Sequence, residues 1–208
     1  MRTVTEPTKP PTTTRRNRDA NVIAAAIAVM SERGYSATSV QEVADRVGVL
    51  KGSLYHYFSS KEGLLFRILE ESHQQNAEII SRVSQLELSA FEELIEYMRQ
   101  SSTWYLANIE RANIFFTESR HLTGDRLAEA QKLGRNFEKH VQKLIALAQE
   151  SGDVRGDIDH RLISRYVLGS LNSVRLSPNR TGQQLADQTI VDALIDLTRA
   201  AIQAPRAQ

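Results

Sequence analysis

Cysteine is absent from this chain of 208 residues, and its absence excludes several kinds of protein at once. Without a thiol there is no disulfide framework, no thiolate metal site and no cysteine nucleophile. Long apolar runs are also missing, since no stretch approaches the roughly 18 uncharged apolar residues that a membrane span needs. The N-terminus lacks the continuous apolar segment of a signal peptide, so we expect a cytoplasmic protein that does not engage a membrane.

The signatures of common catalytic sites are missing as well. The histidines His73, His121, His140 and His160 are scattered, and none of them belongs to an H-E-x-x-H zinc motif. Neither a Gly-rich phosphate loop nor a G-x-S-x-G nucleophile elbow occurs. We therefore expect a protein that is not an enzyme and that carries no metal and no cofactor.

The composition is that of a folded chain with one unusual end. Hydrophobic residues make up 41% of the sequence, and the net charge is +1, so a substantial core is available. Residues 1–18 are different, because three prolines lie among threonines and the segment carries +4, which leaves −3 for the rest of the chain. This composition predicts a disordered basic arm over residues 1–18, with Asp19 as the N-cap of the first helix. Its basic residues are Arg2, Lys9, Arg15, Arg16 and Arg18.

Three short helical segments follow the arm. Apolar spacing predicts a helix over residues 20–33 that Gly34 ends. Ser39 is placed to cap a second helix, which Gly48 ends, and the run Leu50–Tyr57 predicts a third, with Phe58 facing the core. Two short helices joined through a glycine turn are typical of a helix-turn-helix.

The rest of the chain reads as a larger helical domain. Ser59 and Glu62 form a capping-box pattern ahead of a long helix that we expect to end near Arg82. Apolar periodicity then predicts five further helices. They cover residues 88–108, 110–121, 125–150, 158–176 and 183–203. The expected fold is all-α with about nine helices, divided into a helix-turn-helix domain at 19–66 and a C-terminal domain at 67–208.

An ordered set of short segments resembles one known family, the tetracycline-repressor-like (TetR) regulators. The matching segments are Gly34–Val40, Val43–Ala44, Val47–Val49, Gly52–Phe58 and Lys61–Leu65. Beyond residue 70 the resemblance is limited to the number of helices and the turn at 152–157. It implies a transcriptional regulator whose N-terminal domain binds DNA and whose C-terminal domain binds a small molecule and forms a homodimer.

The residues of the third helix suit contact with DNA. A helix fits the major groove, where Lys51 can reach a guanine and Ser53 a base or a phosphate. The resemblance also places Tyr55 and Tyr57 among the family's usual DNA-contacting positions. Ser39 has an alternative role as a cap alone, and the arginines of the arm have one as a solvated tail. The predicted DNA-binding residues are Arg15, Arg16, Thr38, Ser39, Gln41, Lys51, Gly52, Ser53, Tyr55, His56, Tyr57 and Lys61.

Aromatic and polar side chains gather in the central helices of the C-terminal domain. Pockets between bundle helices are common ligand sites, although an aromatic stripe also suits plain core. The predicted ligand-binding residues are Tyr97, Trp104, Tyr105, Phe115, Phe116, Glu118, Asn172 and Arg175. The resemblance assigns dimerisation to the last two helices, with the residues Leu162, Tyr166, Leu171, Leu185, Ile190, Leu194 and Leu197.

These features predict a repressor that binds a palindromic operator and is released by a small apolar or amphipathic effector. Similar Gly-Ser-Leu-Tyr-His segments occur in family members that sense acyl-CoA, whereas other members sense drug-like molecules. Two alternatives remain open. In the first, the C-terminal domain is only a dimerisation or protein-interaction module. In the second, the chain binds DNA without regard to sequence.

Overall fold

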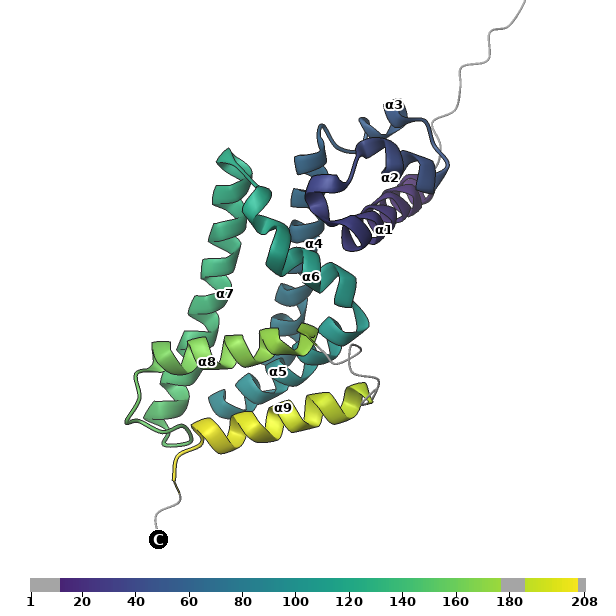
Figure 1. The fold of residues 1–208 in the computed structure, drawn as a ribbon. Helices are drawn as coiled ribbons and strands as arrows, with labels where there is room; N and C mark the ends of the chain where they lie inside the picture. The colour runs from purple at the N-terminus through teal and green to yellow at the C-terminus, as the bar shows by residue number, and fades with distance from the viewer. Residues whose placement is uncertain (1–11, 177–185, 206–208) are drawn as a thin grey trace, which may run out of the picture.

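The computed structural model describes residues 12–176 and 186–205, which fold into nine α-helices and two short 3₁₀ helices with no β-strand among them (Figure 1). The predicted all-α fold and number of helices are confirmed for these residues. The elements are α1 Thr12–Ala37, α2 Val40–Val47, α3 Lys51–Leu54, α4 Lys61–Ser84, α5 Ala90–Ala107, α6 Ile109–Glu118, η1 Ser119–His121, α7 Gly124–Glu150, α8 His160–Ser173, η2 Val174–Leu176 and α9 Asp187–Ile202.

The helices form two packed regions, which we call the head and the body. The head consists of α1 to α3 and the first turns of α4, and the body contains the rest of α4 and the later helices (Figure 1). Each region has its own core, yet Ile114 and Leu122 of the body pack into the core of the head. The domain boundary predicted after residue 66 lies within α4 and stays a prediction.

The helix ends of α2 follow from local sequence, as predicted. The Ser39 hydroxyl accepts a hydrogen bond from the Glu42 N–H, and the Glu42 side chain accepts one from the Ser39 N–H. This reciprocal pair is a capping box. At the other end Gly48 has φ 74° and ψ 35°, a left-handed conformation that glycine adopts without steric cost.

The first helix is longer than predicted. It begins at Thr12, so Asp19 lies inside the helix and the expected cap and the helical start at residue 20 are wrong. No proline or glycine interrupts the sequence between Pro11 and Gly34, which lets the helix extend toward the N-terminus from its packed face. Gly34, with φ 76° and ψ 161°, interrupts the helix at the predicted place. The side chains of Arg15 and Arg16 lie outside the described part.

The segment around α3 also differs from the prediction. The helix covers only Lys51–Leu54, and the next residues form a turn in which the Tyr57 N–H donates to the Leu54 carbonyl at 2.8 Å. The N-cap of α4 is Ser60, whose hydroxyl accepts from the Gly63 N–H at 3.0 Å. The predicted cap at Ser59 is therefore wrong, and Glu62 does not close a capping box.

The body matches the predicted helices closely. α5, α6, α7, α8 and α9 coincide with the five expected segments, although α6 and α8 each end in a 3₁₀ turn. α7 forms one edge of the body, and α8 and α9 lie at the end far from the head (Figure 1). Among the described residues, no helix combines the length and the apolar character needed to cross a bilayer.

Candidate nucleic-acid interface and effector cavity

The outer edge of the head presents half of the predicted DNA-binding residues together. Lys51, Gly52, Tyr55 and His56 are exposed, and Ser53 is half-buried. They belong to α3 and the turn after it, at the end of the molecule opposite α9 (Figure 1). Tyr57 is half-buried in the same turn. The structure thus groups these residues on one surface, and their contact with DNA stays a prediction.

Two buried residues hold this edge in place. Leu54 is fully buried and Phe58 is 9% exposed, and both belong to the core of the head. The prediction that Phe58 packs inward is confirmed. Leu50, directly before α3, is by contrast 81% exposed, and sequence reasoning did not select it. An exposed leucine beside polar side chains suits contact with a thymine methyl group.

At the start of α2, Ser39 and Gln41 are both exposed. The Ser39 hydroxyl serves as the helix cap, and the Gln41 side-chain amide donates to Asp45 Oδ1 at 2.7 Å. These internal bonds leave both side chains at the surface, where free N–H groups of the first helical turn favour an anion.

Thr38 and Lys61, in contrast, make contacts within the head. Thr38 is 3% exposed, and its hydroxyl donates to the Gly34 carbonyl at 2.8 Å. The Lys61 ammonium donates to the carbonyls of Tyr35, Ser36 and Thr38 at 3.0, 3.2 and 2.9 Å, which uses its three donors in this arrangement. The DNA contacts predicted for these two residues stay predictions.

The body encloses an apolar chamber of about 340 Å³. Four predicted aromatic residues line it, namely Trp104, Tyr105, Phe115 and Phe116. The residues that sequence reasoning did not select are Ser72, His73, Asn76, Gly134, Phe137, Glu138, Leu168 and Leu171. A volume of this size falls within the usual range for small-molecule sites.

A signal for the α4 wall was present in the sequence. Ser72 and Asn76 continue the spacing of the buried residues Leu65 and Leu69 along one face of the helix. The sequence has small polar residues at these two positions, where an apolar stripe would be expected. Such residues indicate that this face of the helix borders a cavity and does not pack against core side chains. His73 lies next to them and meets the Phe115 ring edge-on, with 4.8 Å between ring centroids.

Burial controls the charge of the titratable groups in this wall. It lowers the pKa of His73, so the imidazole is neutral at pH 7. It also raises the pKa of the Tyr105 phenol. His73 and Tyr105 therefore offer neutral hydrogen-bonding groups within an apolar wall, which suits an uncharged or apolar part of a ligand, and the carboxyl group of Glu138 lies in the same lining.

The other predicted ligand residues lie behind or beside the chamber. Tyr97 is 1% exposed and donates its hydroxyl to Asn76 Oδ1 at 2.7 Å, so it orients a lining residue. Glu118 pairs with His121 at 3.2 Å. Arg175 donates to Asn172 at 2.5 Å and lies 5.2 Å from the Phe116 ring centroid. These four predicted residues do not line the chamber.

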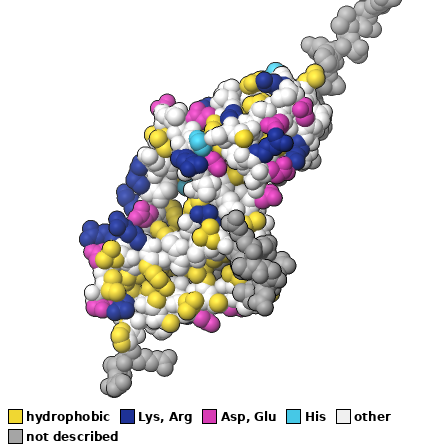
Figure 2. Space-filling model, viewed as in Figure 1, with side chains coloured by type: hydrophobic (Ala, Val, Ile, Leu, Met, Phe, Trp, Pro, Cys, Tyr) yellow, Lys and Arg dark blue, Asp and Glu magenta, His cyan; other side chains and the backbone are white. Residues whose placement is uncertain are grey.

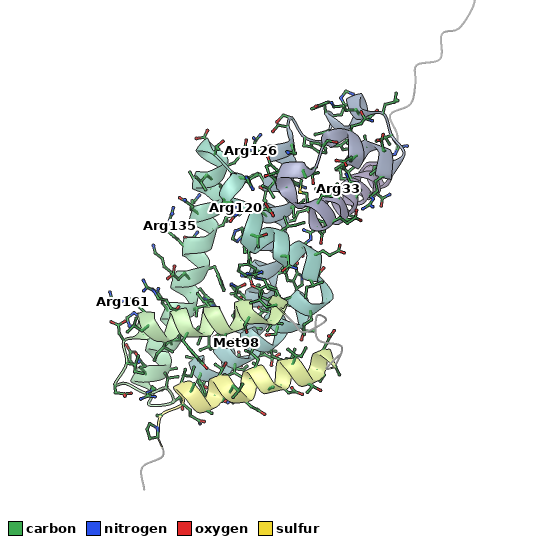
Figure 3. All side chains as sticks on the ribbon, viewed as in Figure 1. Arg33, Met98, Arg120, Arg126, Arg135 and Arg161 are labelled. Carbon is green, nitrogen blue, oxygen red and sulfur yellow. The ribbon has the colours of Figure 1, made fainter. Side chains whose placement is uncertain are left out.

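The chamber adjoins a hollow of about 420 Å³ between α4, the end of α6 and α7. The two share His73, Phe115, Phe116 and Gly134 as lining residues. Arg120, Ser119 and Gln131 border the outer hollow, which we call the mouth, and Figure 3 labels Arg120 in the gap between α6 and α7. The lining of the mouth is mainly apolar, and Arg120 is its charged residue.

Comparison with known proteins decides the family. The family described as "Bacterial regulatory proteins, tetR family" matches residues 22–68, and "Tetracyclin repressor-like, C-terminal domain" matches residues 87–200. The chain is a member of the TetR family. It is accordingly a DNA-binding transcriptional regulator, and the predicted family is confirmed.

Several known proteins resemble this TetR regulator over most of their length. The "HTH-type transcriptional repressor KstR2" of Mycobacterium tuberculosis is 25% identical over 202 residues, which cover 89% of this chain and 96% of the relative. The solved structure of that protein, a "ketosteroid transcriptional regulator", has a TM-score of 0.81 at 24% identity and covers 90% and 96% of the two chains. A structure of AibR has a TM-score of 0.78 at 25% identity, with coverage of 86% and 97%.

The last two helices of this TetR regulator present an apolar outer face. Leu162, Tyr166 and Leu197 are 57%, 45% and 67% exposed, which is unusual for large apolar side chains grouped on two neighbouring helices. Ile190 and Leu194 are half-buried against the core of the body. Leu171 is 2% exposed and lines the chamber, so its assignment to a dimer face is corrected. Leu185 lies outside the described residues.

Proposed function

We propose that this protein is a repressor that binds a palindromic operator as a homodimer and is released from it by an amphipathic effector. The observation that carries the proposal is the apolar chamber of about 340 Å³, which adjoins the mouth bordered by Arg120. A site of this shape accommodates a molecule with an apolar body and a charged group at one end. We assign no catalysis to it and expect it to act in the cytoplasm.

The charges around the mouth favour an anionic group on the effector. Arg120 is exposed there, and Lys132, Arg135 and Lys139 are exposed at successive turns of α7. Figure 2 shows Lys and Arg side chains along this edge of the molecule, over α7. Cationic groups near an opening attract anions and raise their local concentration.

Two solved structures support the acyl-CoA class, whose members join an apolar acyl chain to an anionic nucleotide. The AibR structure is described as a complex with isovaleryl coenzyme A and operator DNA. That of FadR from Bacillus subtilis, which has a TM-score of 0.73 at 19% identity over 88% and 98% of the two chains, is described as a complex with stearoyl-CoA. An acyl chain would occupy the chamber, and the nucleotide would lie at the mouth.

For DNA recognition we propose that Lys51, Ser53, Tyr55, His56 and Tyr57 contact the major groove. Phosphate contacts would fall to the start of α2, at Ser39 and Gln41, and to the arginines Arg15 and Arg16. A two-fold dimer places its recognition helices about 34 to 36 Å apart on a palindromic site. The exposed α8–α9 face of Leu162, Tyr166 and Leu197 provides the self-complementary surface that such a dimer needs.

The test is fluorescence-anisotropy titration of the palindromic DNA flanking the protein's own gene, with a scrambled duplex as competitor. We expect binding that resists the competitor, and a loss of about 5- to 150-fold in Tyr55→Ala, since one good contact contributes about 1–3 kcal/mol. Gln142→Ala, on α7 far from the head, is the matched control. Equal binding to both duplexes would establish a sequence-blind DNA binder instead.

The effector is tested by adding straight-chain acyl-CoA thioesters of increasing length to the operator complex. Coupling of about 1–3 kcal/mol would weaken operator binding roughly 5- to 150-fold. Free CoA is the control for the nucleotide alone. A chain that gains no thermal stability and releases no DNA with any thioester would favour a C-terminal domain that serves only dimerisation or protein interaction.

A further inference from the structure

Besides the continuous helix α4 and the packing of Ile114 and Leu122 into the core of the head, a set of hydrogen bonds joins the head to the body. Glu62, in the first turn of α4, accepts hydrogen bonds from the Thr123 N–H and hydroxyl at 2.8 and 3.0 Å. Its other carboxylate oxygen accepts from Arg126 at 2.9 Å. Arg126 also donates to the hydroxyls of Ser60 and Ser59 at 3.5 and 3.3 Å. We call these five residues the Glu62 clamp.

The local sequence explains why the clamp forms. Ser60 caps α4, which leaves the Glu62 side chain free to reach α7 instead of its own helix end. Gly63 lets the guanidinium of Arg126 approach closely, because a Cβ atom at that position would lie 3.3 Å from Arg126 Nη2. The hydrogen bonds from Thr123 and Arg126 lower the pKa of Glu62 and keep its carboxylate charged.

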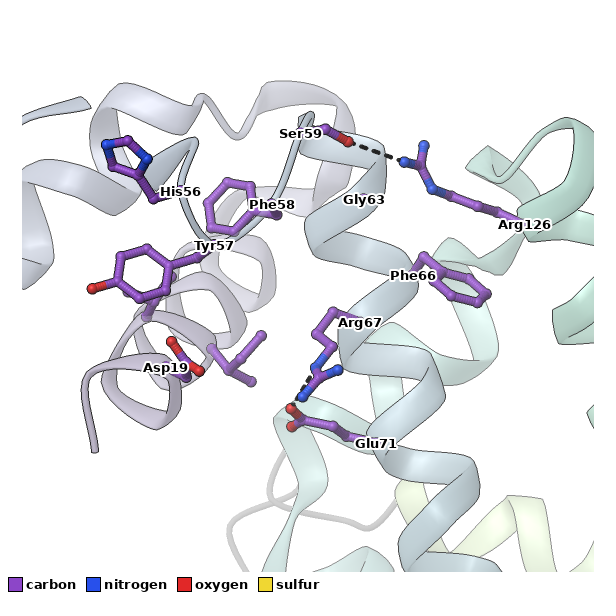
Figure 4. Close-up of a pocket in the computed structure, with 12 residues that line it drawn as sticks. Asp19, His56, Tyr57, Phe58, Ser59, Gly63, Phe66, Arg67, Glu71 and Arg126 are labelled. Atoms are coloured by element: carbon purple, nitrogen blue, oxygen red, sulfur yellow. Dashed lines mark hydrogen bonds and ion pairs between the residues drawn. The ribbon is translucent and has the colours of Figure 1, made fainter. Parts of the chain in front are cut away.

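The clamp touches the recognition turn at one end. Ser59 directly follows Phe58, which anchors the turn that contains Tyr55 and His56 in the core of the head. Figure 4 shows Arg126 extending from α7 toward Ser59, with His56, Tyr57 and Phe58 in the adjoining segment. A displacement of Arg126 therefore acts on the backbone immediately after the predicted DNA-reading residues.

At its other end the clamp is attached to the wall of the chamber. α7 carries both Arg126 and the lining residues Gly134, Phe137 and Glu138. Eight residues of α-helix separate Arg126 from Gly134, a length of roughly 12 Å. A helix of this length moves as a rigid element, so a shift of the wall at Gly134 is carried to Arg126.

We propose that the Glu62 clamp transmits the position of α7 to the recognition turn, so that an occupied chamber changes the orientation of the head through Arg126. This inference rests on the proposed function, since it concerns the same effector chamber. It makes Glu62, Thr123 and Arg126 positioning residues for DNA binding, although none of them lies among the predicted DNA contacts.

The first test measures the orientation of the head without any effector. Because the chain has no cysteine, Ser31→Cys on the head and Lys139→Cys on α7 give two defined sites for nitroxide labels. Excess unlabelled protein confines the measured distances to one chain. We expect Arg126→Ala to broaden or shift the distance distribution, with Arg126→Lys intermediate. Arg135→Ala, on the same helix and without an ion pair among the described residues, should leave it unchanged.

A distribution in Arg126→Ala that matches that of the unsubstituted protein would overturn the proposal. Gly63→Ala provides a second variant that keeps every charge. Its added Cβ would lie 3.3 Å from Arg126 Nη2 and would move the guanidinium by a few tenths of an ångström, so we expect a smaller change than in Arg126→Ala. Circular dichroism confirms that each variant is folded before its distances are interpreted.

The second test fills the chamber from within the chain. A Cβ at Gly134 meets no atom within 4 Å, so Gly134→Phe adds a ring to the wall of the chamber and imitates occupancy. We expect it to change affinity for the palindromic operator roughly 5-fold or more, and to have less than half that effect in an Arg126→Ala background. This comparison is a double-mutant cycle between the wall and the clamp.

The outcomes separate the two proposals. Equal fold-changes in both backgrounds would overturn transmission through the clamp and leave α4 and the packing of Ile114 and Leu122 as the connections. No change from Gly134→Phe in the unsubstituted background, together with no release by acyl-CoA, would contradict the proposed effector response. In that case the label distances still decide whether the clamp sets the orientation of the head.

Discussion

Buried polar groups are handled differently in the head and in the body. In the head, the buried Thr38 hydroxyl donates to the Gly34 carbonyl, and Lys61 donates to three carbonyls. Asp19 is the exception there, since its Oδ1 is buried without a hydrogen-bond partner among the described residues. In the body, Ser102, Ser164 and Thr198 are fully buried, and their hydroxyls have no hydrogen-bond partner among the described residues. A buried polar group without a partner costs stability, so the interior of the body is the less optimised of the two.

The chamber points in the same direction. Both regions have a hollow, but the linings differ. The one of about 380 Å³ at the head is bordered by charged residues such as Asp19, Arg67 and Arg126, whereas the body keeps about 340 Å³ open beside its aromatic residues, where close packing is the norm. The head must keep one shape to bind DNA, and hydrogen bonds to its buried polar groups make that shape more stable. The body must accept a molecule and respond to it, which requires space and a modest stability.

The largest expected contrast comes from truncating one leucine in each region. Leu54→Ala should cost about 2–5 kcal/mol of unfolding free energy, because Leu54 is fully buried in the core of the head. Leu171→Ala should cost about 2 kcal/mol, since one side of Leu171 already faces the chamber. Urea denaturation followed by circular dichroism measures both, and the fluorescence of Trp104 reports on the body. A larger cost at Leu171 would contradict the comparison.

Two threonine substitutions should have opposite signs. Thr38→Val removes a buried hydroxyl that is hydrogen-bonded and should destabilise the protein by about 1–2 kcal/mol. Thr198→Val removes one without a partner among the described residues and should stabilise it by about 1 kcal/mol. Both replacements keep the size of the side chain. Midpoints of urea denaturation give the two values, and effects of equal sign would refute the contrast between the regions.

Glycine to alanine substitutions extend the contrast to the backbone. Gly48 has φ 74°, where alanine is strained by about 1–2 kcal/mol, so Gly48→Ala should lower stability. Gly134 lies inside α7 with no atom within 4 Å of an added Cβ, so Gly134→Ala should raise stability by about 0.5–1 kcal/mol. Thermal denaturation distinguishes them, and a destabilising Gly134→Ala would mean that the wall of the chamber has no spare room.

The smallest effect concerns acid. Burial lowers the pKa of His73 in the folded protein, whereas the unfolded chain keeps the ordinary value of about 6.5. The unfolded state therefore binds the proton more readily, and stability is lost as the pH falls from about 6.5 through the folded pKa. His73→Gln should flatten this loss but not abolish it, because burial also lowers the pKa of His140. Urea midpoints at pH 7.5 and 5.5 give the loss of stability on acidification. An equal loss in His73→Gln and in the unsubstituted protein would contradict a role for His73.

Features that depend on neighbouring residues in the sequence were predictable. The Ser39 capping box and the left-handed Gly48 are encoded within a few residues, and the structure has both. Phe58 could be assigned to the core of the head for a similar reason. The exact start of α4 was harder to predict. Ser59 and Ser60 can both cap a helix, and only the register of α4 selects Ser60.

Features that depend on contacts distant in sequence were not predictable. Periodicity indicates that Leu171 is buried but not whether it faces a partner chain or the chamber, and the structure places it at the chamber. The sequence predicts Tyr97 as a ligand contact, whereas its hydroxyl binds Asn76 of another helix. It predicts Glu62 as part of a helix cap, but the partners of Glu62 are Thr123 and Arg126, about 60 residues later at the start of α7.

The two faces of α8 have a consequence for how the protein would respond to its effector. Leu168 and Leu171 line the chamber, while Leu162 and Tyr166 of the same helix are exposed on the proposed dimer face. Under the proposed assembly, any movement of this helix alters a binding site and a subunit contact together. Linkage then requires that the factor by which dimerisation changes the effector affinity of each site appears squared in the association constant of the fully occupied dimer, since the dimer has two equal sites. The effector titration should therefore shift with total protein concentration.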